Sequence, residues 1–296
     1  MSNYITPARP LFGPSGSPES FAAEGHTSTA EMPAWLRARG LDVYEYSFGR
    51  GVRLSDATAA KIGAECDKNS VEISVHAPYF INFASVEPEK AANSVRYLTS
   101  SLHALRALGG MRCVFHPGAQ GDQTREDAFA RTKDAFAAAL DEIEAENLGD
   151  LIVCPETMGK LAQIGTVDEV AALCNMGENV YPCVDFGHLN AREGGSLKTT
   201  ADFLAVIDRL AELIGEKKTR NMHIHFSKIQ YGAKGEIRHL TFEDDIFGPD
   251  FEPLAEAIVL RGLTPHILCE SAGTQAEDAA AMRNMWLRAA EATPAF

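Results

Sequence analysis

The sequence has no apolar stretch that approaches the roughly 20 residues of a membrane-spanning helix. Its start, MSNYITPARPLFGPSGSPES, also lacks a charged region followed by an apolar run, so it does not predict a signal peptide. From these two absences we expect a cytoplasmic protein that has no membrane partner.

Cysteine pairs and a basic tail are missing too. The six cysteines contain no CxxC spacing, and four lie in strand-like runs, where cysteine usually acts as a small buried hydrophobe. The formal net charge of −14 counts against nucleic acid as a partner. That objection weakens if divalent cations lie among the carboxylates, because bound ions can invert the charge of a site.

What the chain does have is a series of apolar runs that each end in a residue able to bind a metal. Each run is rich in β-forming residues and bounded by Gly, Pro or polar residues, which is typical of a buried strand. The carboxyl ends of parallel strands meet at one face of a barrel, where active sites of such barrels lie. The runs are VEISVHAP with His76, MRCVFHPG with His116, LIVCPET with Glu156, NVYPCVDFGH with Asp185 and His188, RNMHIHFSK with His223 and His225, and TPHILCES with Glu270.

Strand-like and helix-like segments alternate along the chain. This pattern favours the α/β class and a (β/α)8 TIM barrel in a single domain over residues 1–296. A doubly wound open sheet is the alternative, but its site would gather at one switch point rather than recur along six strands. The longest irregular segment, 229–250, has a length that is more often functional than idle. The predicted strands are 10–13, 41–48, 71–76, 111–116, 151–156, 180–185, 221–227 and 265–270, and the predicted helices are 32–39, 55–68, 87–108, 125–146, a stretch to about 174, 200–214 and 275–290.

The residue types at these strand ends suit a metal. Zinc and manganese bind histidine nitrogen and carboxylate oxygen. A lone histidine at a strand end is more often structural, and taken singly this interpretation is preferred for His76, His116 and His239. A buried carboxylate without a partner is costly, so the three carboxylates at strand ends indicate function even alone. His223 and His225 are two apart and share the inward face of a strand, and only one of them need be a ligand.

In their order and spacing, HAPYFIN, FHPG, PET, DFGH, HIHFSK and CES resemble the endonuclease IV family of apurinic/apyrimidinic endonucleases. That family belongs to the xylose-isomerase-like barrel superfamily, and the resemblance runs from about Val71 to Glu270. It implies a centre of two or three zinc ions, with manganese as the alternative metal. The implied ligands are His76 and His116 for the first zinc, Glu156 bridging the first and second, Asp185, His223 and Glu270 for the second, and His188 and His239 for the third.

The third site departs from the family pattern. Its carboxylate belongs to an Asp-x-His motif in the family, and here that motif reads Ile237-Arg238-His239. The Asp is missing, and Glu236 lies one position away.

The resemblance also implies a hydrolase whose substrate and partner is DNA with abasic sites, and we expect the protein to be a monomer. Tyr79 and Phe80 match a Tyr–Leu pair with which family members enter the DNA minor groove. Glu156 and Glu270 are the implied catalytic carboxylates, and the products are a 3′-hydroxyl and a 5′-deoxyribose phosphate.

Sugar isomerases and epimerases of the same superfamily provide the alternative. This chain resembles them through the single-metal set Glu156, Asp185, His223 and Glu270. In that case the substrate is a small sugar or sugar phosphate. Glu156 and Glu270 would then exchange a proton with the carbon next to the carbonyl.

Overall fold

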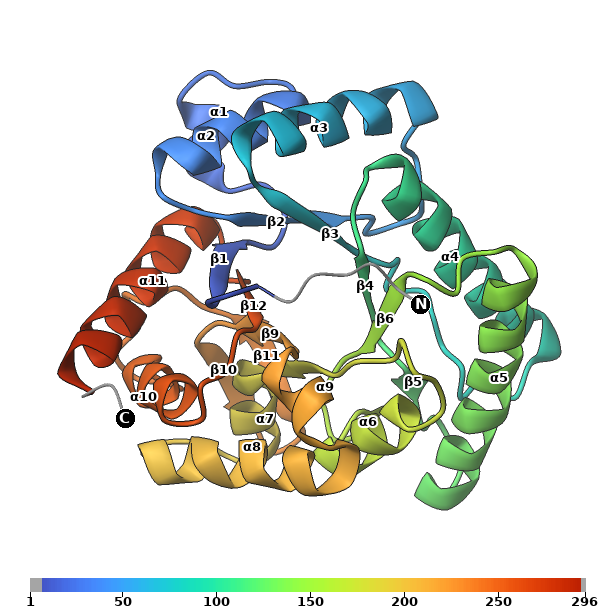
Figure 1. Cartoon of the computed structure of the whole chain (residues 1–296). Coiled ribbons are helices and arrows are strands. Elements are labelled where there is room, and N and C mark those ends of the chain that lie inside the picture. The colour runs from blue at the N-terminus through green and yellow to red at the C-terminus, as the bar shows by residue number, and fades with distance from the viewer. Residues whose placement is uncertain (1–6, 294–296) are drawn as a thin grey trace.

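Eight parallel strands form the centre of the molecule (Figure 1). In the computed structural model, which describes residues 7–293, they form two four-stranded sheets of order β1-β12-β9-β8 and β2-β3-β4-β6. Parallel bridges from Ser15 to Glu45 and from Glu156 to Cys183 join the two sheets, so the strands close into a barrel. This closure confirms the predicted TIM barrel and excludes the open sheet. The barrel strands are β1 (Leu11–Pro14), β2 (Val43–Ser47), β3 (Glu72–His76), β4 (Arg112–Phe115), β6 (Ile152–Pro155), β8 (Cys183–Asp185), β9 (His223–Phe226) and β12 (His266–Cys269).

The helices surround the barrel, and several begin at a side-chain cap (Figure 1). The Thr124 hydroxyl accepts from the Asp127 N–H at 3.1 Å, and Thr166 and Glu169 form a reciprocal capping box. The helices are α1 (Glu19–Ala23), η1 (Thr29–Glu31), α2 (Met32–Ala38), α3 (Asp56–Asn69), α4 (Pro88–Ala107), α5 (Arg125–Ala145), α6 (Val167–Cys174), α7 (Phe186–Arg192), α8 (Thr200–Ile214), α9 (Glu216–Arg220), α10 (Glu252–Leu260) and α11 (Gln275–Ala292).

The segment 229–250 after β9 is irregular only over residues 240–250, so the prediction was wrong for residues 229–239. It contains β10 (Ile229–Gly232) and β11 (Gly235–His239), which pair as an antiparallel hairpin. Its sequence IQYGAKGEIRH is largely polar, so it lacks the apolar alternation that marks a strand. A second short ribbon pairs β5 (Gly118–Ala119) with β7 (Gln163–Ile164). The helices α1, α7, α9 and α10 were not predicted either.

Two kinds of packing hold the barrel. Between strands and helices the core is apolar and rich in aromatic rings, such as Phe115 and Phe136 at 5.3 Å between ring centroids. The inside of the barrel is mixed. There Leu11, Val43 and Leu268 form a small apolar cluster. The buried polar side chains of this interior are Glu45, Ser74, Arg112, His223 and His225. Burying such groups is costly unless they have partners, so the contacts among them decide what the interior does.

Two expectations drawn from absences can be compared with the structure. All six cysteines are buried and free of disulfides, which agrees with cysteine as a small buried hydrophobe. Among the described residues, no helix is both long enough and apolar enough to span a bilayer.

Candidate metal centre

Side chains at the carboxyl ends of the strands converge at one end of the barrel. They form three adjoining groups, and within each group the atoms able to bind a metal lie within 4.8 Å of one another. Glu156 belongs to two of the groups, which makes it the centre of the arrangement. We call them the first group (His76, His116 and Glu156), the second group (Glu156, Asp185, His225 and Glu270) and the third group (His188, Glu236 and His239).

The first group lies on one oxygen of Glu156. His76 Nε2 and His116 Nε2 each lie 3.1 Å from Glu156 Oε2. The His76 Nδ1–H donates to the Ala77 carbonyl at 2.9 Å. Because a carbonyl only accepts, this contact keeps a proton on Nδ1 and leaves Nε2, which faces the carboxylate, as the atom that can hold a second proton or a metal.

In the second group, the histidine contacts the other oxygen of Glu156, Oε1. His225 Nδ1 lies 3.2 Å from Glu156 Oε1 and 3.5 Å from Glu270 Oε1. Asp185 caps α7, where its Oδ1 accepts from the His188 N–H at 2.7 Å. Its Oδ2 is buried, lies 3.2 Å from His188 Nδ1 and forms no hydrogen bond with any of the described residues. A buried carboxylate oxygen of this kind, beside a nitrogen and two further carboxylates, fits a divalent cation.

The third group has a carboxylate despite the missing Asp of the family motif. His188 Nε2 lies 3.5 Å from Glu236 Oε2, and the rings of His188 and His239 are 5.4 Å apart. The His188 Nδ1–H donates to the Thr157 carbonyl at 3.0 Å, and His239 Nδ1 lies 2.8 Å from the Ser227 hydroxyl. These contacts leave the two Nε2 atoms for the group.

A β-bulge explains how Glu236 reaches the face of His239. Residues three apart in a regular strand point to opposite faces. Here Gln230 pairs with Arg238 but Tyr231 pairs with Glu236, so Ile237 has no partner across the hairpin. The extra residue returns Glu236 to the face of His239, which is how bulges commonly redirect a side chain near a site.

The structure places His225, rather than His223, in the second group. Asp185 is in register with His225, whereas Cys183 is in register with His223. Both rings point into the barrel, but two residues along a strand span about 6.6 Å, so His223 lies one layer deeper. With Cys183 and His225 it forms a further buried group, and its Nε2 lies 3.0 Å from Glu45 Oε2. His225 therefore lies in the second group, where the resemblance implied His223.

Glu45 is a buried carboxylate that the sequence analysis did not identify. It lies in β2, inside the barrel and beneath the second group. Its only signal in the sequence is one charge within the stretch VYEYS, residues 43–47. A strand with one solvent-facing charge has the same pattern, so the sequence alone does not separate these cases.

The central carboxylates differ in their electrostatics. Burial raises the pKa of Glu156, but His225 and His116 outweigh burial and hold this pKa well below its usual range. Burial raises the pKa of Asp185 to about 6, opposed by His188 and reinforced by Glu270 and Glu156. Glu156 therefore stays negatively charged to a lower pH than Asp185 does.

The histidines around these carboxylates hold protons strongly. Burial alone would lower the pKa of His76, yet Glu156 raises it to about 9. Burial likewise opposes protonation of His188, and Asp185 and Glu156 raise its pKa to about 10. The centre therefore favours positive charge, which ring protons or divalent cations can supply in competition with one another.

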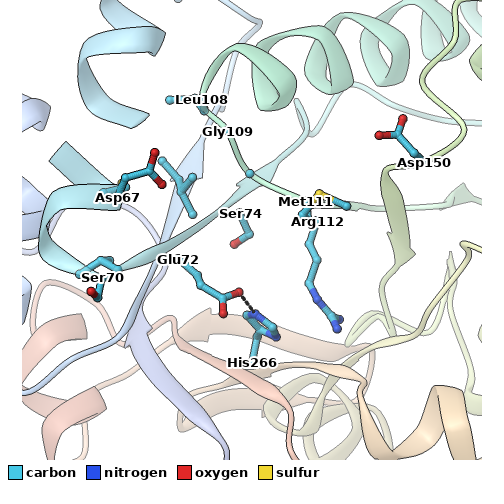
Figure 2. A pocket seen from close by; sticks show the side chains of 14 residues that line it. Asp67, Ser70, Glu72, Ser74, Leu108, Gly109, Met111, Arg112, Asp150 and His266 are labelled. Atoms are coloured by element: carbon cyan, nitrogen blue, oxygen red, sulfur yellow. Dashed lines mark hydrogen bonds and ion pairs between the residues drawn. The ribbon is translucent and has the colours of Figure 1, made fainter. Parts of the chain in front are cut away.

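All three groups open onto a cleft of about 220 Å³. Lys160, Gln163 and Tyr79 also line it. A larger cavity of about 600 Å³ lies at the other end of the barrel, where Glu72 and His266 form an ion pair (Figure 2). The convergence of ligand atoms, rather than cavity size, identifies the candidate centre.

Tyr79 and Phe80 lie on the loop that follows β3 at the rim of the cleft. Their side chains are about half exposed, and their rings are 4.7 Å apart. The Arg50 Nε–H donates to the Tyr79 hydroxyl at 3.0 Å. The two rings are therefore exposed beside the candidate metal centre, as the minor-groove contact implied by the resemblance requires.

Comparison with known proteins places the chain in a family. A model of the xylose isomerase-like TIM barrel family matches residues 33–290. An uncharacterised protein of Methanocaldococcus jannaschii is 32% identical over 261 residues, which cover 88% of this chain and 91% of that protein. A probable endonuclease 4 of Mycoplasma pneumoniae is 31% identical over 181 residues. The match spans 60% of that relative's length.

Solved structures give the same fold. Endonuclease IV from Thermus thermophilus superposes with a TM-score of 0.71 at 20% identity, covering 96% of this chain and 100% of that chain. An L-ribulose 3-epimerase superposes with a TM-score of 0.65 at 18% identity, covering 95% of each chain. The resemblance to endonuclease IV seen in the motifs is confirmed by these matches, and the chain belongs to the xylose isomerase-like TIM barrel family.

Proposed function

We propose that this protein is a metal-dependent phosphodiesterase that incises DNA at abasic sites. The position of Glu156 carries the proposal, because its two oxygens face two different ligand groups. A third group adjoins them. A single-metal isomerase needs only the second group, so the first and third groups would have no purpose in such an enzyme. The endonuclease 4 relatives support the same choice.

The residues fit zinc or manganese, since each group offers only histidine nitrogen and carboxylate oxygen. Metal ions bound there would polarise the phosphate and lower the pKa of a water. Glu156 would hold two ions and orient the water. In the reaction a P–O bond forms to the water oxygen, the bond from phosphorus to the 3′-oxygen breaks, and a water proton passes to that oxygen.

The remaining residues of the cleft would position DNA. Lys160 lines the cleft and supplies a positive charge for a phosphate. Tyr79 and Phe80 are exposed at the rim, where they would enter the space of a missing base. Opening such a site costs little because no base is stacked there. With a formal net charge of −14, the protein would bind intact duplex poorly.

A sugar isomerase or epimerase is the second candidate. The second group alone is a complete four-ligand site, with His225 in place of His223. A cleft of about 220 Å³ also suits a small sugar. In that enzyme Glu156 and Glu270 would move a proton at the carbon next to the carbonyl.

Metal count separates the two candidates before any assay. We expect elemental analysis of the purified protein to show at least two zinc or manganese ions per chain, because the three groups exceed the ligands of one ion. One ion at full occupancy would favour the isomerase.

The decisive test is nicking of a labelled duplex that carries a tetrahydrofuran abasic analogue, with added Zn²⁺ or Mn²⁺. Incision 5′ to the lesion, with intact duplex left uncut, is the expected result. A panel of aldose–ketose isomerisations and epimerisations runs beside it. No nicking with either metal, together with turnover of any sugar, would replace the proposal by its alternative.

A further inference from the structure

A buried glutamate links the barrel interior to the candidate metal centre. Glu45 has no exposed surface, and each of its oxygens has two polar neighbours. Oε1 accepts from the Ser15 hydroxyl at 2.9 Å and lies 2.9 Å from His225 Nε2. Oε2 accepts from the Ser74 hydroxyl at 3.0 Å and lies 3.0 Å from His223 Nε2. Both oxygens are therefore acceptors, and the two serines hold the carboxylate in place.

The contact with His225 determines which of its nitrogens is available. A neutral imidazole carries one N–H and one lone pair. Nε2 lies 2.9 Å from Glu45 Oε1, and Nδ1 lies 3.2 Å from Glu156 Oε1, so each nitrogen faces an accepting carboxylate and is placed to carry a proton when no metal is bound. Nδ1 is the nitrogen that faces the second group, since it also lies 3.5 Å from Glu270 Oε1, so a metal bound there would replace the proton on Nδ1 and leave the proton on Nε2 beside Glu45.

From these contacts we infer that Glu45 is a positioning residue for the second group: it fixes the tautomer and orientation of His225 so that Nδ1 points at the group. Histidine ligands of metals commonly donate their other N–H to a carboxylate in this way, which also makes the ligand more basic. The inference rests on the proposed metal-dependent function. The inference extends that function from the metal ligands to Glu45, a residue of β2 that does not line the cleft.

His223 provides the contrast within the same network. It shares the Glu45 carboxylate with His225, but it lies one layer deeper and outside the second group. If Glu45 acts through His225, removing His223 leaves the essential contact intact. If the polar interior only supports folding, changes at Glu45 and at His223 affect metal binding alike.

The first experiment uses the unaltered protein. Long-range ¹H–¹⁵N correlation spectra of the zinc-loaded chain report which nitrogen of each ring carries a proton, with His225→Gln used only to assign the signal. We expect His225 to carry its proton on Nε2 and to show a metal-bound Nδ1. A proton on Nδ1, or coordination through Nε2, would overturn the inference whatever the variants do.

The second experiment compares Glu45→Gln with His223→Gln, using Co²⁺ as the probe. Glutamine keeps the size of Glu45 but removes its charge, and loss of such a partner typically weakens metal binding about 10- to 100-fold. We expect Glu45→Gln to weaken Co²⁺ binding about tenfold or more and to shift the visible Co²⁺ absorption bands. His223→Gln should bind Co²⁺ as the unaltered protein does. Equal affinity in Glu45→Gln, or equal losses in both variants, contradicts the inference.

A fallback variant and the choice of readouts ensure that every outcome tests the inference. If Glu45→Gln does not fold, Ser74→Ala removes one donor to the carboxylate and leaves its charge, so a smaller shift of the Co²⁺ bands is expected and an unchanged spectrum counts against the inference. The readouts are metal binding and ring protonation, not activity. A protein that binds metal through His225 Nδ1 but nicks no DNA would refute the proposed function alone.

Discussion

The two ends of the barrel hold buried charge in different ways. At the amino ends of the strands, Glu72 Oε2 lies 2.7 Å from His266 Nε2 (Figure 2). Arg112 Nη2 donates to the Asn221 carbonyl at 2.8 Å. At the carboxyl ends, three carboxylates gather with one another as the second group. At the amino end one carboxylate lies beside one histidine, whereas at the carboxyl end several carboxylates and histidines lie together.

Histidines show the effect of this difference. Burial lowers the pKa of His266, with Arg112 adding to the effect and Glu72 opposing it. His188 is also buried, yet Asp185 and Glu156 raise its pKa to about 10. The same residue type is thus driven toward opposite protonation states by the carboxylates around it. The larger cavity lies at the amino end, so the size of a cavity does not indicate which end of this barrel carries the reactive groups.

The largest effect is expected where Glu156 is changed. Glu156→Gln should cut metal content and lower nicking about 100-fold or more, because the several kcal/mol of charge stabilisation that bound metals provide would be lost. Elemental analysis and the abasic nicking assay measure both. Glu72→Gln is the matched control at the amino end and should change neither. If Glu156→Gln keeps its metals and turnover, the bridging role fails.

The third group gives a more selective effect. Glu236→Ala should release one metal ion and leave the others. Gly159→Ala should do the same, because a Cβ there would lie 2.7 Å from Glu236 Cβ and 3.0 Å from His188 Cδ2. Metal content per chain is the measurement. Gly232→Ala is the control on the same hairpin, since its Cβ would meet only Ile237 at 3.4 Å. Unchanged metal content in the first two variants would show that the group holds no ion.

The aromatic pair should affect DNA but not the chemistry. Tyr79→Ala combined with Phe80→Ala should reduce abasic nicking about tenfold, as expected when aromatic contacts to nucleotides of about 1–3 kcal/mol are lost. Hydrolysis of bis(p-nitrophenyl) phosphate should stay the same. Leu260→Ala removes another exposed apolar side chain, on α10, and should leave both rates unchanged. Equal losses with the small substrate would mean that the pair supports the centre and does not bind DNA.

The smallest effect concerns His266 and the pH dependence of stability. Its lowered pKa means that, below about pH 6.5, the unfolded chain takes up a proton that the folded chain resists. The stability it contributes is therefore present above that pH and lost as the pH falls. We expect the Tm advantage of the unaltered protein over His266→Gln to narrow by about 2 °C between about pH 7.5 and about pH 5.5. If this Tm difference instead grows as the pH falls, then folding raises the pKa of His266 and the prediction is wrong.

The sequence predicts the barrel and the end of it that carries the site, because each apolar run stops at a polar residue where a parallel strand ends. It does not choose between His223 and His225, since that choice depends on the register of β9 with β8. Glu45 stays hidden because one charge inside a strand has no distinguishing neighbour in the sequence. Side-chain facing is local and repeats every two residues, whereas the height of a residue in the barrel is set by the strands beside it.

The bulge at Ile237 also bears on how related sequences are compared. An added residue in a flat strand would turn every later side chain to the opposite face. Here the distortion is confined to one position, and Ile237 itself points outward with 56% of its surface exposed. The hairpin thus accommodates one extra residue, and Glu236 and His239 still point to the same face. Spacing between ligands along the chain is therefore a poor criterion for excluding relatives of this protein, and alignment of facing residues is a better one.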